Sequence, residues 1–205
     1  MINISQNVIN AFNQNTRIIA ELVGLPGRGV SSSAISILKV LSEQYNAATI
    51  YLYSSDSSMN HKMYKKLAAR DTLFYSYKPD ESYCNLLDTI EMMASKLDTT
   101  NFKTYILIDD FARVILNLGY KNIKKFMSSL QILVIKYNLN IVFTNQFRYN
   151  LNQKEDGGQY RILYENYLNS YLDFIIEVSK DNETDINVNL LFDNKLNRFT
   201  FSNVV

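Results

Sequence analysis

A glycine-rich turn near the N-terminus holds residues suited to binding an anion. The stretch 24–31, Gly-Leu-Pro-Gly-Arg-Gly-Val-Ser, matches the glycines and the serine of the phosphate-binding pattern G-x-x-x-x-G-K-S/T. In that pattern backbone N–H groups surround the phosphate oxygens, and the lysine neutralises their charge. Val30 stands at the lysine position, so this turn would bind an anion through backbone amides and the dipole of the following helix. The residues expected to line the site are Gly24, Gly27, Gly29, Ser31 and Ser32.

A second feature is an apolar segment that ends in two acids. Residues 105–108, Tyr-Ile-Leu-Ile, have the composition of a strand buried on both faces of a parallel sheet, and Asp109 and Asp110 follow. In enzymes that cleave nucleoside triphosphates an acid at this place holds Mg²⁺, so Asp109 is the predicted metal ligand. Taken singly, a glycine-rich turn or a strand ending in Asp also occurs in ordinary α/β proteins. Together, in this order and about 80 residues apart, they are typical of one ATPase architecture.

A third apolar segment ends in polar amides and leads into a long polar stretch. Residues 141–146, Ile-Val-Phe-Thr-Asn-Gln, predict a strand, with Gln146 placed to sense a phosphate and to signal to the residues that follow. The stretch 147–161 mixes basic and aromatic side chains, a combination suited to single-stranded nucleic acid. The predicted DNA contacts are Arg148, Tyr149, Lys154 and Arg161. A solvated loop is the other interpretation, because Glu155 and Asp156 reduce the positive charge.

The elements that must position these side chains alternate along the sequence. Apolar segments predict strands at 17–23, 48–53, 72–77, 103–108 and 139–144. Amphipathic segments predict helices at 2–13, from Ser31 to about Tyr45, through Met63 and Leu67, at 83–97 and at 117–137. Three further strands, at 172–178, 185–192 and 197–201, follow one another closely. The predicted fold class is α/β, with a mostly parallel central sheet, helices on both faces and a C-terminal antiparallel β-meander.

Composition narrows the class of protein. The 205 residues are 47% hydrophobic and 20% charged, which excludes a disordered or collagen-like chain and favours one domain over 1–205, with a helical segment at 1–15. Lys and Arg number 21 against 20 Asp and Glu, so a basic surface must be local. A single cysteine excludes an internal disulfide, and no segment has the pattern of a signal peptide or a membrane span. We therefore expect an intracellular protein that has no membrane partner.

The segment that ends in Gln146 carries the most specific pattern in the chain. Residues 138–146, Asn-Leu-Asn-Ile-Val-Phe-Thr-Asn-Gln, resemble the segment of RecA-type recombinases, particularly archaeal RadA and RadB and eukaryotic recombinase paralogs, that precedes their second DNA-binding loop. The resemblance covers 17–203 in order: the glycine-rich turn as a degenerate P-loop, Asp109 as the Walker B acid, and then the β-meander. It implies a RecA-like P-loop ATPase core, ATP and Mg²⁺ as cofactors, and 147–161 as a DNA-binding loop.

Departures from the family pattern imply a reduced activity. Val30 removes a positive charge from the phosphates, where charge gathers in the transition state. The family's water-positioning acid falls on Ser55, which leaves Asp56 as the one catalytic candidate. The family's small N-terminal DNA-binding domain and its F-x-x-A tether between protomers are expected to be missing. The resemblance therefore implies a core-only recombinase paralog with weak or absent ATP hydrolysis.

The function implied by this resemblance is an accessory one. The chain would assist homologous recombination and DNA repair by binding single-stranded DNA, a recombinase or a sister paralog subunit, in the cytoplasm or, in a eukaryote, the nucleus. Two other functions remain open. One is an active DNA-dependent ATPase of the RecA superfamily, in which Arg28 or a partner's residue replaces the missing lysine. The other is a scaffold subunit that binds neither nucleotide nor DNA.

Overall fold

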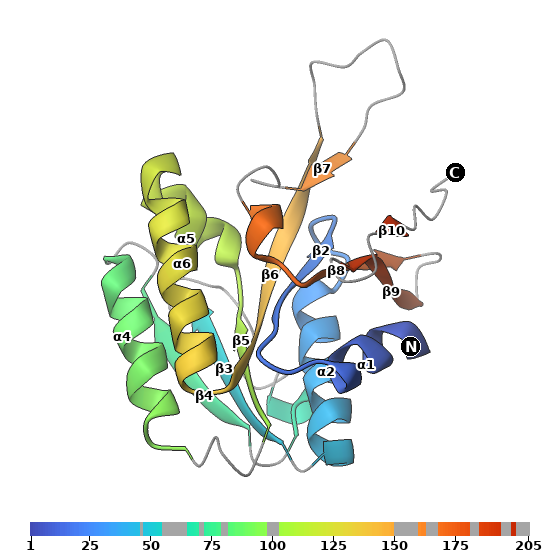
Figure 1. The fold of residues 1–205 in the computed structure, drawn as a ribbon. Helices are drawn as coiled ribbons and strands as arrows, with labels where there is room; N and C mark the ends of the chain where they lie inside the picture. The colour runs from blue at the N-terminus through green and yellow to red at the C-terminus, as the bar shows by residue number, and fades with distance from the viewer. Residues whose placement is uncertain are drawn as a thin grey trace.

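A central sheet with helices on both faces is the frame of the computed structural model (Figure 1). The structure describes residues 1–45, 47–54, 65–69, 72–78, 82–97, 103–149, 160–162, 168–180, 185–193 and 198–199. The strands are β1 (Ile2–Ile4), β2 (Ile19–Gly24), β3 (Ala48–Ser54), β4 (Leu73–Tyr77), β5 (Thr104–Ile108), β6 (Leu139–Tyr149), β7 (Tyr160–Ile162), β8 (Phe174–Lys180), β9 (Ile186–Asp193) and β10 (Arg198–Phe199). The helices are α1 (Gln6–Gln14), α2 (Val30–Tyr45), α4 (Tyr83–Ala94), α5 (Phe111–Leu118), α6 (Tyr120–Lys136) and the short 3₁₀ helix η1 (Asn169–Tyr171).

The strand order explains which residues meet at the sheet edge. It runs β1-β9-β8-β2-β6-β5-β3-β4, with β10 beside β9 and β7 beside β6. The strands from β8 to β4 in this order are parallel to their neighbours, whereas β9 is antiparallel to β8 and β10 is antiparallel to β9. The predicted fold class, a mostly parallel sheet followed by antiparallel C-terminal strands, is confirmed.

Two apolar layers hold the helices against the sheet. The strands β2 and β5 are buried along their whole length, as their nearly continuous apolar sequences predict for central parallel strands. Helices α1 and α2 pack on one face through residues such as Phe12 and Leu41, and α4, α5 and α6 pack on the other through residues such as Ile90 and Phe126 (Figure 1). These layers fix the carboxyl ends of the strands relative to the N-terminus of α2.

The N-terminal segment differs from the helix predicted at 2–13. Residues 2–4 form β1, which runs parallel to β9 with Ile2 opposite Ile186, and the helix begins only at Gln6. The alternation of Ile2 and Ile4 is compatible with a strand as well as a helix, and both side chains pack against the core on the α1 and α2 face. Pairing with a distant strand therefore decided the conformation.

Two other boundaries also differ from the prediction. The segment predicted as one helix at 117–137 is two helices, α5 and α6, which are separated at Gly119 with a φ of 64°. The strand predicted at 139–144 continues to Tyr149, where it pairs antiparallel with β7. The predicted loop 147–161 is therefore a hairpin at its two ends, and residues 150–159 lie outside the described part of the chain. Among the described residues, no helix has the length and hydropathy needed to cross a membrane.

Candidate functional site

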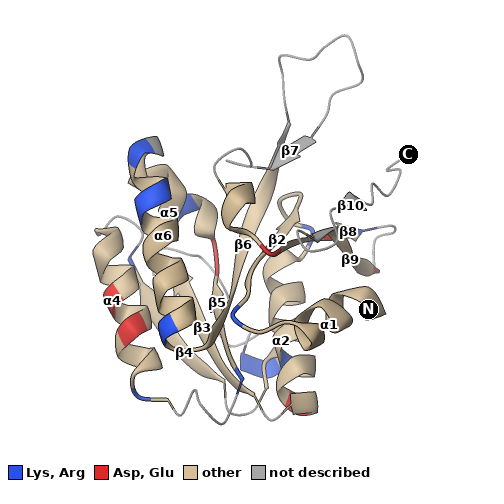
Figure 2. Ribbon diagram, viewed as in Figure 1, with Lys and Arg blue, Asp and Glu red and all other residues tan. Residues whose placement is uncertain are grey.

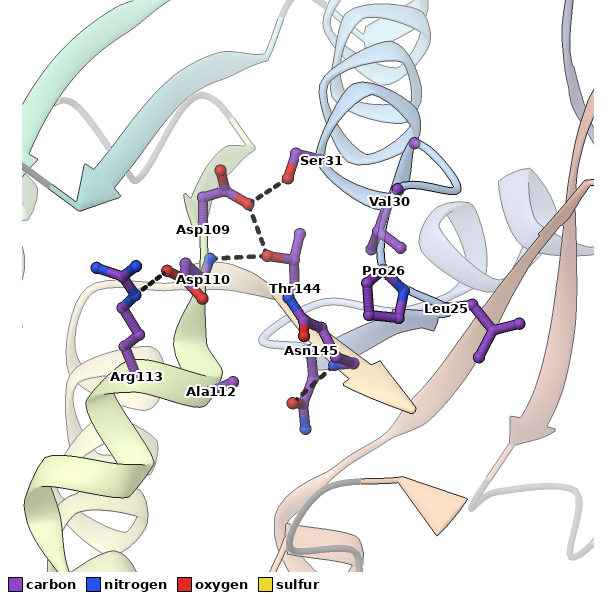
Figure 3. Close-up of a pocket in the computed structure, with 13 residues that line it drawn as sticks. Leu25, Pro26, Val30, Ser31, Asp109, Asp110, Ala112, Arg113, Thr144 and Asn145 are labelled. Atoms are coloured by element: carbon purple, nitrogen blue, oxygen red, sulfur yellow. Dashed lines mark hydrogen bonds and ion pairs between the residues drawn. The ribbon is translucent and has the colours of Figure 1, made fainter. Parts of the chain in front are cut away.

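The carboxyl ends of β2, β5 and β6 meet the N-terminus of α2 at one edge of the sheet. A pocket of about 440 Å³ opens there (Figure 3). It is lined by Leu25, Pro26, Gly27, Gly29, Val30, Ser31, Asp109, Asp110, Ala112, Arg113, Thr144, Asn145 and Gln146. Open α/β sheets bind ligands outside the carboxyl ends of their parallel strands, so the pocket lies where this fold positions a ligand.

The loop between β2 and α2 has the backbone that an anion cradle requires. Gly27 and Gly29 have φ angles of 76° and 82°, in the left-handed region that glycine adopts without a steric cost. The N–H of Arg28 donates to the carbonyl of Leu25 at 3.1 Å, and the N–H of Ser33 donates to the carbonyl of Gly29 at 2.9 Å. A Cβ added to Gly27 would meet no atom within 4 Å, so the loop is open at this position.

Asp109 is the best-connected side chain of the site. It follows β5, is 1% exposed, and accepts hydrogen bonds from hydroxyl groups on three other elements. Ser31 and Thr144 donate to its Oδ1 at 2.7 and 2.6 Å, and Tyr51 donates to its Oδ2 at 2.7 Å. The Tyr77 hydroxyl donates to its backbone carbonyl, and burial raises the pKa of this tyrosine. The carboxylate therefore joins α2, β3 and β6 to the end of β5.

The next residue, Asp110, forms the wall of the pocket on the α5 side. Its backbone is left-handed, with a φ of 57°, and its N–H donates to the Thr144 hydroxyl at 2.9 Å. Its carboxylate forms an ion pair with Arg113, with 2.9 Å between Oδ2 and Nε (Figure 3). Burial raises the pKa of Asp110; the Arg113 charge opposes this rise and the Asp109 charge adds to it.

A buried acid stands in the strand that leads into the loop. Glu21, in β2, is 0% exposed, and Asn145 Nδ2 donates to its Oε1 at 2.6 Å. The Oδ1 of Asn145 in turn accepts from the backbone N–H of Gln146 at 2.8 Å. This chain of hydrogen bonds connects the strand before the loop with Gln146, the residue predicted to sense a phosphate.

The charges around the pocket follow from the same residues. The charged side chains in its described lining are two acids, Asp109 and Asp110, and one base, Arg113. Val30 begins α2, half-buried against the core, in the place of the pattern's lysine. Arg28, the proposed substitute for that lysine, is exposed in the loop and is not part of the lining.

Other basic residues of the described chain lie outside the pocket lining. Figure 2 shows a group of them on α6, where Lys121, Lys124 and Lys125 are exposed. None of the three is among the residues that line the pocket. The charge available inside the described lining is therefore negative on balance.

The structure brings five of the predicted site residues into one pocket: Gly27, Gly29, Ser31, Asp109 and Gln146. Gly24 lies outside its lining, buried at the end of β2 where a Cβ would be 2.7 Å from the Val178 carbonyl oxygen, and Ser32 lies half-buried in α2. The predicted DNA contacts Arg148 and Tyr149 fall in β6 and Arg161 in β7. Asp56 and Lys154 lie outside the described residues.

Sequence reasoning assigned no part in the site to several residues that build it: Glu21, Tyr51, Asp110, Arg113 and Thr144. Thr144 lies within the segment that contains Gln146, and its position at a strand end is the available signal. Glu21 is a charged residue within an apolar strand, which indicates a specific buried partner. Arg113 follows Asp110 by three residues, an ion-pair spacing that becomes visible once α5 is recognised as a helix.

Comparison with known proteins supports the fold. No protein-family model matches the chain, and no curated protein matches it. Among solved structures, the ATPase domain of a DnaB-like helicase is similar, with a TM-score of 0.60 and 14% sequence identity over 83% of this chain and 72% of that one. Together with the mostly parallel sheet, this likeness gives the chain a RecA-like α/β core.

The residues of the pocket fit a magnesium ion and phosphate groups. The Ser31 hydroxyl and the Asp109 carboxylate are oxygen donors of the kind that Mg²⁺ prefers, and they lie within 2.7 Å of each other. The glycine loop supplies backbone N–H groups at the start of a 16-residue helix, an arrangement that favours anions. Without a lysine, most of the compensating positive charge would have to come from the ion.

Proposed function

We propose that the protein binds a nucleoside di- or triphosphate with Mg²⁺ at this pocket, hydrolyses it weakly or not at all, and acts as an accessory protein of homologous recombination and DNA repair. One observation carries the nucleotide part: the loop, Ser31 and Asp109 keep the arrangement of a phosphate-binding site, whereas Val30 occupies the lysine position. The recombination part rests on the sequence resemblance and on the RecA-like fold.

Each residue of the pocket has a part in this binding. The N–H groups of the loop and of the first turn of α2 would donate to phosphate oxygens. Ser31 and Asp109 would hold the ion, which bridges phosphate oxygens and neutralises their charge when bound. Thr144 keeps Asp109 oriented through the 2.6 Å hydrogen bond, and Tyr51 does so from the other oxygen.

Slow hydrolysis follows from the missing lysine. Negative charge spreads over the oxygens of the transferred phosphoryl group in the transition state, and catalysis depends on fixed positive groups placed there. The valine side chain has neither charge nor donor. Binding can be retained, because backbone amides and the ion contact the ground state too, but the transition state loses a stabilising contact.

Calorimetric titration of the full chain with ATP and ADP, with and without Mg²⁺, tests the nucleotide part. We expect binding that requires Mg²⁺ and that weakens about tenfold or more in Ser31→Ala, since that variant removes an oxygen ligand. Val30→Lys should tighten ATP binding by a similar factor, because it adds a charge-assisted contact. Absence of binding in the wild-type protein would contradict the proposal, and rapid turnover that Ser31→Ala removes would favour an active ATPase.

DNA binding by the β6 and β7 hairpin forms the second part of the proposal. In this antiparallel pair Arg148 is the register partner of Arg161, and Tyr149 is the register partner of Tyr160. Directly opposed residues of an antiparallel pair share a face of the ladder, and two opposed cations repel unless an anion lies with them. A phosphate backbone supplies such an anion, and aromatic residues supply stacking surfaces for bases.

Fluorescence anisotropy with a labelled single-stranded oligonucleotide, over a series of salt concentrations, tests the hairpin. The Arg148→Gln, Arg161→Gln double variant should bind more weakly, and its plot of log affinity against log salt should be shallower by about 0.7 for each lost phosphate contact. Lys121→Gln, an exposed change on α6, serves as the control for net charge. Equal affinities and slopes for the wild-type protein and the double variant would exclude the hairpin as the DNA contact.

A further inference from the structure

Arg113 contributes the one basic side chain to the described lining of the pocket, and it does so from α5, across from the glycine loop. In Figure 3, Arg113 and Asp110 lie on one side of Thr144 and Asn145, and Pro26 and Val30 lie on the other. We propose that Arg113 supplies the positive charge that the loop lacks and contacts the terminal phosphate of the bound nucleotide. This inference rests on the proposed nucleotide binding and names the residue that would distinguish a triphosphate from a diphosphate.

The position of Arg113 favours it over Arg28 for this part. Arg28 is exposed in the loop between two glycines and is outside the pocket lining, so its charge faces solvent. Arg113 is 47% exposed, which leaves its guanidinium room to change rotamer, and its backbone is fixed in a helix that packs against β6. A guanidinium binds phosphate through two parallel N–H donors, so a single arginine gives a directed contact.

Asp110 holds this guanidinium when no phosphate is bound. The ion pair spans 2.9 Å and joins residues three apart on one helix face. The Asp110 backbone cannot follow the arginine readily, because its N–H is bonded to Thr144 at 2.9 Å and its carboxylate lies at the start of α5. A terminal phosphate would therefore compete with Asp110 for Arg113, and Asp110 would weaken the binding of nucleotide through this competition and through its own negative charge.

Titration with MgATP, MgADP and magnesium tripolyphosphate tests the assignment. Arg113→Ala should lower the affinity for MgATP about tenfold or more and that for MgADP much less, because the lost contact is with the terminal phosphate. Arg113→Lys should recover part of the loss, since it keeps the charge without the fork of donors. Asp110→Asn, which keeps the side-chain shape and tolerates the left-handed backbone, should raise the affinity for MgATP several-fold. Arg28→Ala and Lys121→Ala, each of which removes one positive charge outside the pocket lining, are the matched controls.

The outcomes separate this inference from the function on which it rests. If MgATP binds the wild-type protein and Arg113→Ala equally well, the assignment of Arg113 is wrong and nucleotide binding stands. An effect of Arg28→Ala that equals that of Arg113→Ala would also overturn it. If nucleotides fail to bind while tripolyphosphate binds and depends on Arg113, the nucleotide proposal fails and the phosphate contact stands. If none of the three probes binds, both are overturned.

Discussion

Asp109 links four elements through hydrogen bonds, so its carboxylate supports the fold as well as the pocket. The hydroxyl groups of Tyr51 and Thr144 that it accepts from belong to buried residues, and they would lose their acceptor if the carboxylate were removed. A buried donor left without a partner costs about 1–3 kcal/mol. The same side chain is also the candidate ligand for Mg²⁺, so variants at this position change stability and binding together.

Substitution of Asp109 should therefore destabilise the protein even without ligand. We expect Asp109→Ala to lower the free energy of unfolding by about 2–5 kcal/mol, since two buried hydroxyl groups lose their acceptor. Asp109→Asn keeps one acceptor oxygen and should cost less. Urea denaturation followed by circular dichroism measures both values, and equal stability of the alanine variant and the wild-type protein would show that this network contributes nothing.

The raised pKa of Asp110 predicts a dependence of stability on pH. A carboxyl whose pKa is higher in the folded state binds more protons folded than unfolded, so its contribution to stability falls as the pH rises. The fall starts near the ordinary value of 3.8, continues through the raised folded value, and then levels off. In Asp110→Asn this part of the pH profile should vanish, as denaturation curves between pH 3.5 and about 7 would show. A wild-type minus variant difference that is constant over this range would contradict the prediction.

At the scale of elements, the end of one strand supports the phosphate loop from behind. A Cβ on Gly29 would lie 2.7 Å from Cδ1 of Ile186, the first residue of β9. The strand β1 pairs with the same segment of β9, and the backbone N–H of Ile186 donates to the Met1 carbonyl at 2.9 Å. The loop is thus backed by strands that come from both ends of the described chain.

This contact predicts a measurable coupling between Gly29 and Ile186. Gly29→Ala should destabilise the protein by about 1–2 kcal/mol through its left-handed φ alone, with a further cost from the contact with Ile186. Ile186→Val removes the contacting Cδ1, so the double variant should lose less stability than the two single changes summed. Gly27→Ala, where φ is 76° but no atom lies within 4 Å, should show no coupling to Ile186→Val. Additive free energies for the Gly29 pair would disprove the contact.

Periodicity found most of the elements but not all of their ends. The strands β3, β4 and β5 agree with their predicted segments to within a residue or so, because each is a short apolar run bounded by polar residues. The strand β1 and the break at Gly119 escaped, since two isoleucines suit either conformation and a lone glycine does not by itself end a helix. Helix α5 follows directly after the two acids, whose position at a strand end conceals the helix start in the sequence.

For the molecule as a whole, the sequence predicted the class of fold and five lining residues of the pocket, but not the order of the strands. That order depends on pairings such as Ala20 with Phe174, which join segments with no local signal for each other. The same limit applies to the site: Ser31 and Asp109 carry recognisable patterns, whereas Tyr51 and Arg113 reach it only through packing. Motif residues can be predicted from spacing, and their supporting partners require the three-dimensional arrangement.

A ligand that binds across several elements should stabilise the whole molecule. The pocket joins β2, α2, β5, α5 and β6, so nucleotide would bind the folded state and have no comparable site in the unfolded chain. At a concentration of about 100 times the Kd, binding adds about 2.7 kcal/mol to the free energy of unfolding. We expect thermal denaturation to show a higher Tm with MgATP, and a much smaller rise with ATP in EDTA or in Ser31→Ala. An equal rise in all three conditions would place the ligand elsewhere.

The position of β2 between β6 and β8 also bears on how the chain acquires its structure during synthesis. The strand that carries the phosphate loop is made early, but its two neighbours, which pair with it through Ile141 and Phe174, emerge much later. Pairings this distant in sequence form slowly, because the intervening chain must first be ordered. A nascent or truncated chain that ends before residue 174 would leave one edge of β2 open, and an apolar strand with an open edge is a template for aggregation. Recovery of soluble protein should therefore depend on completing the C-terminal third, even though the motif that suggests its chemistry lies in the first.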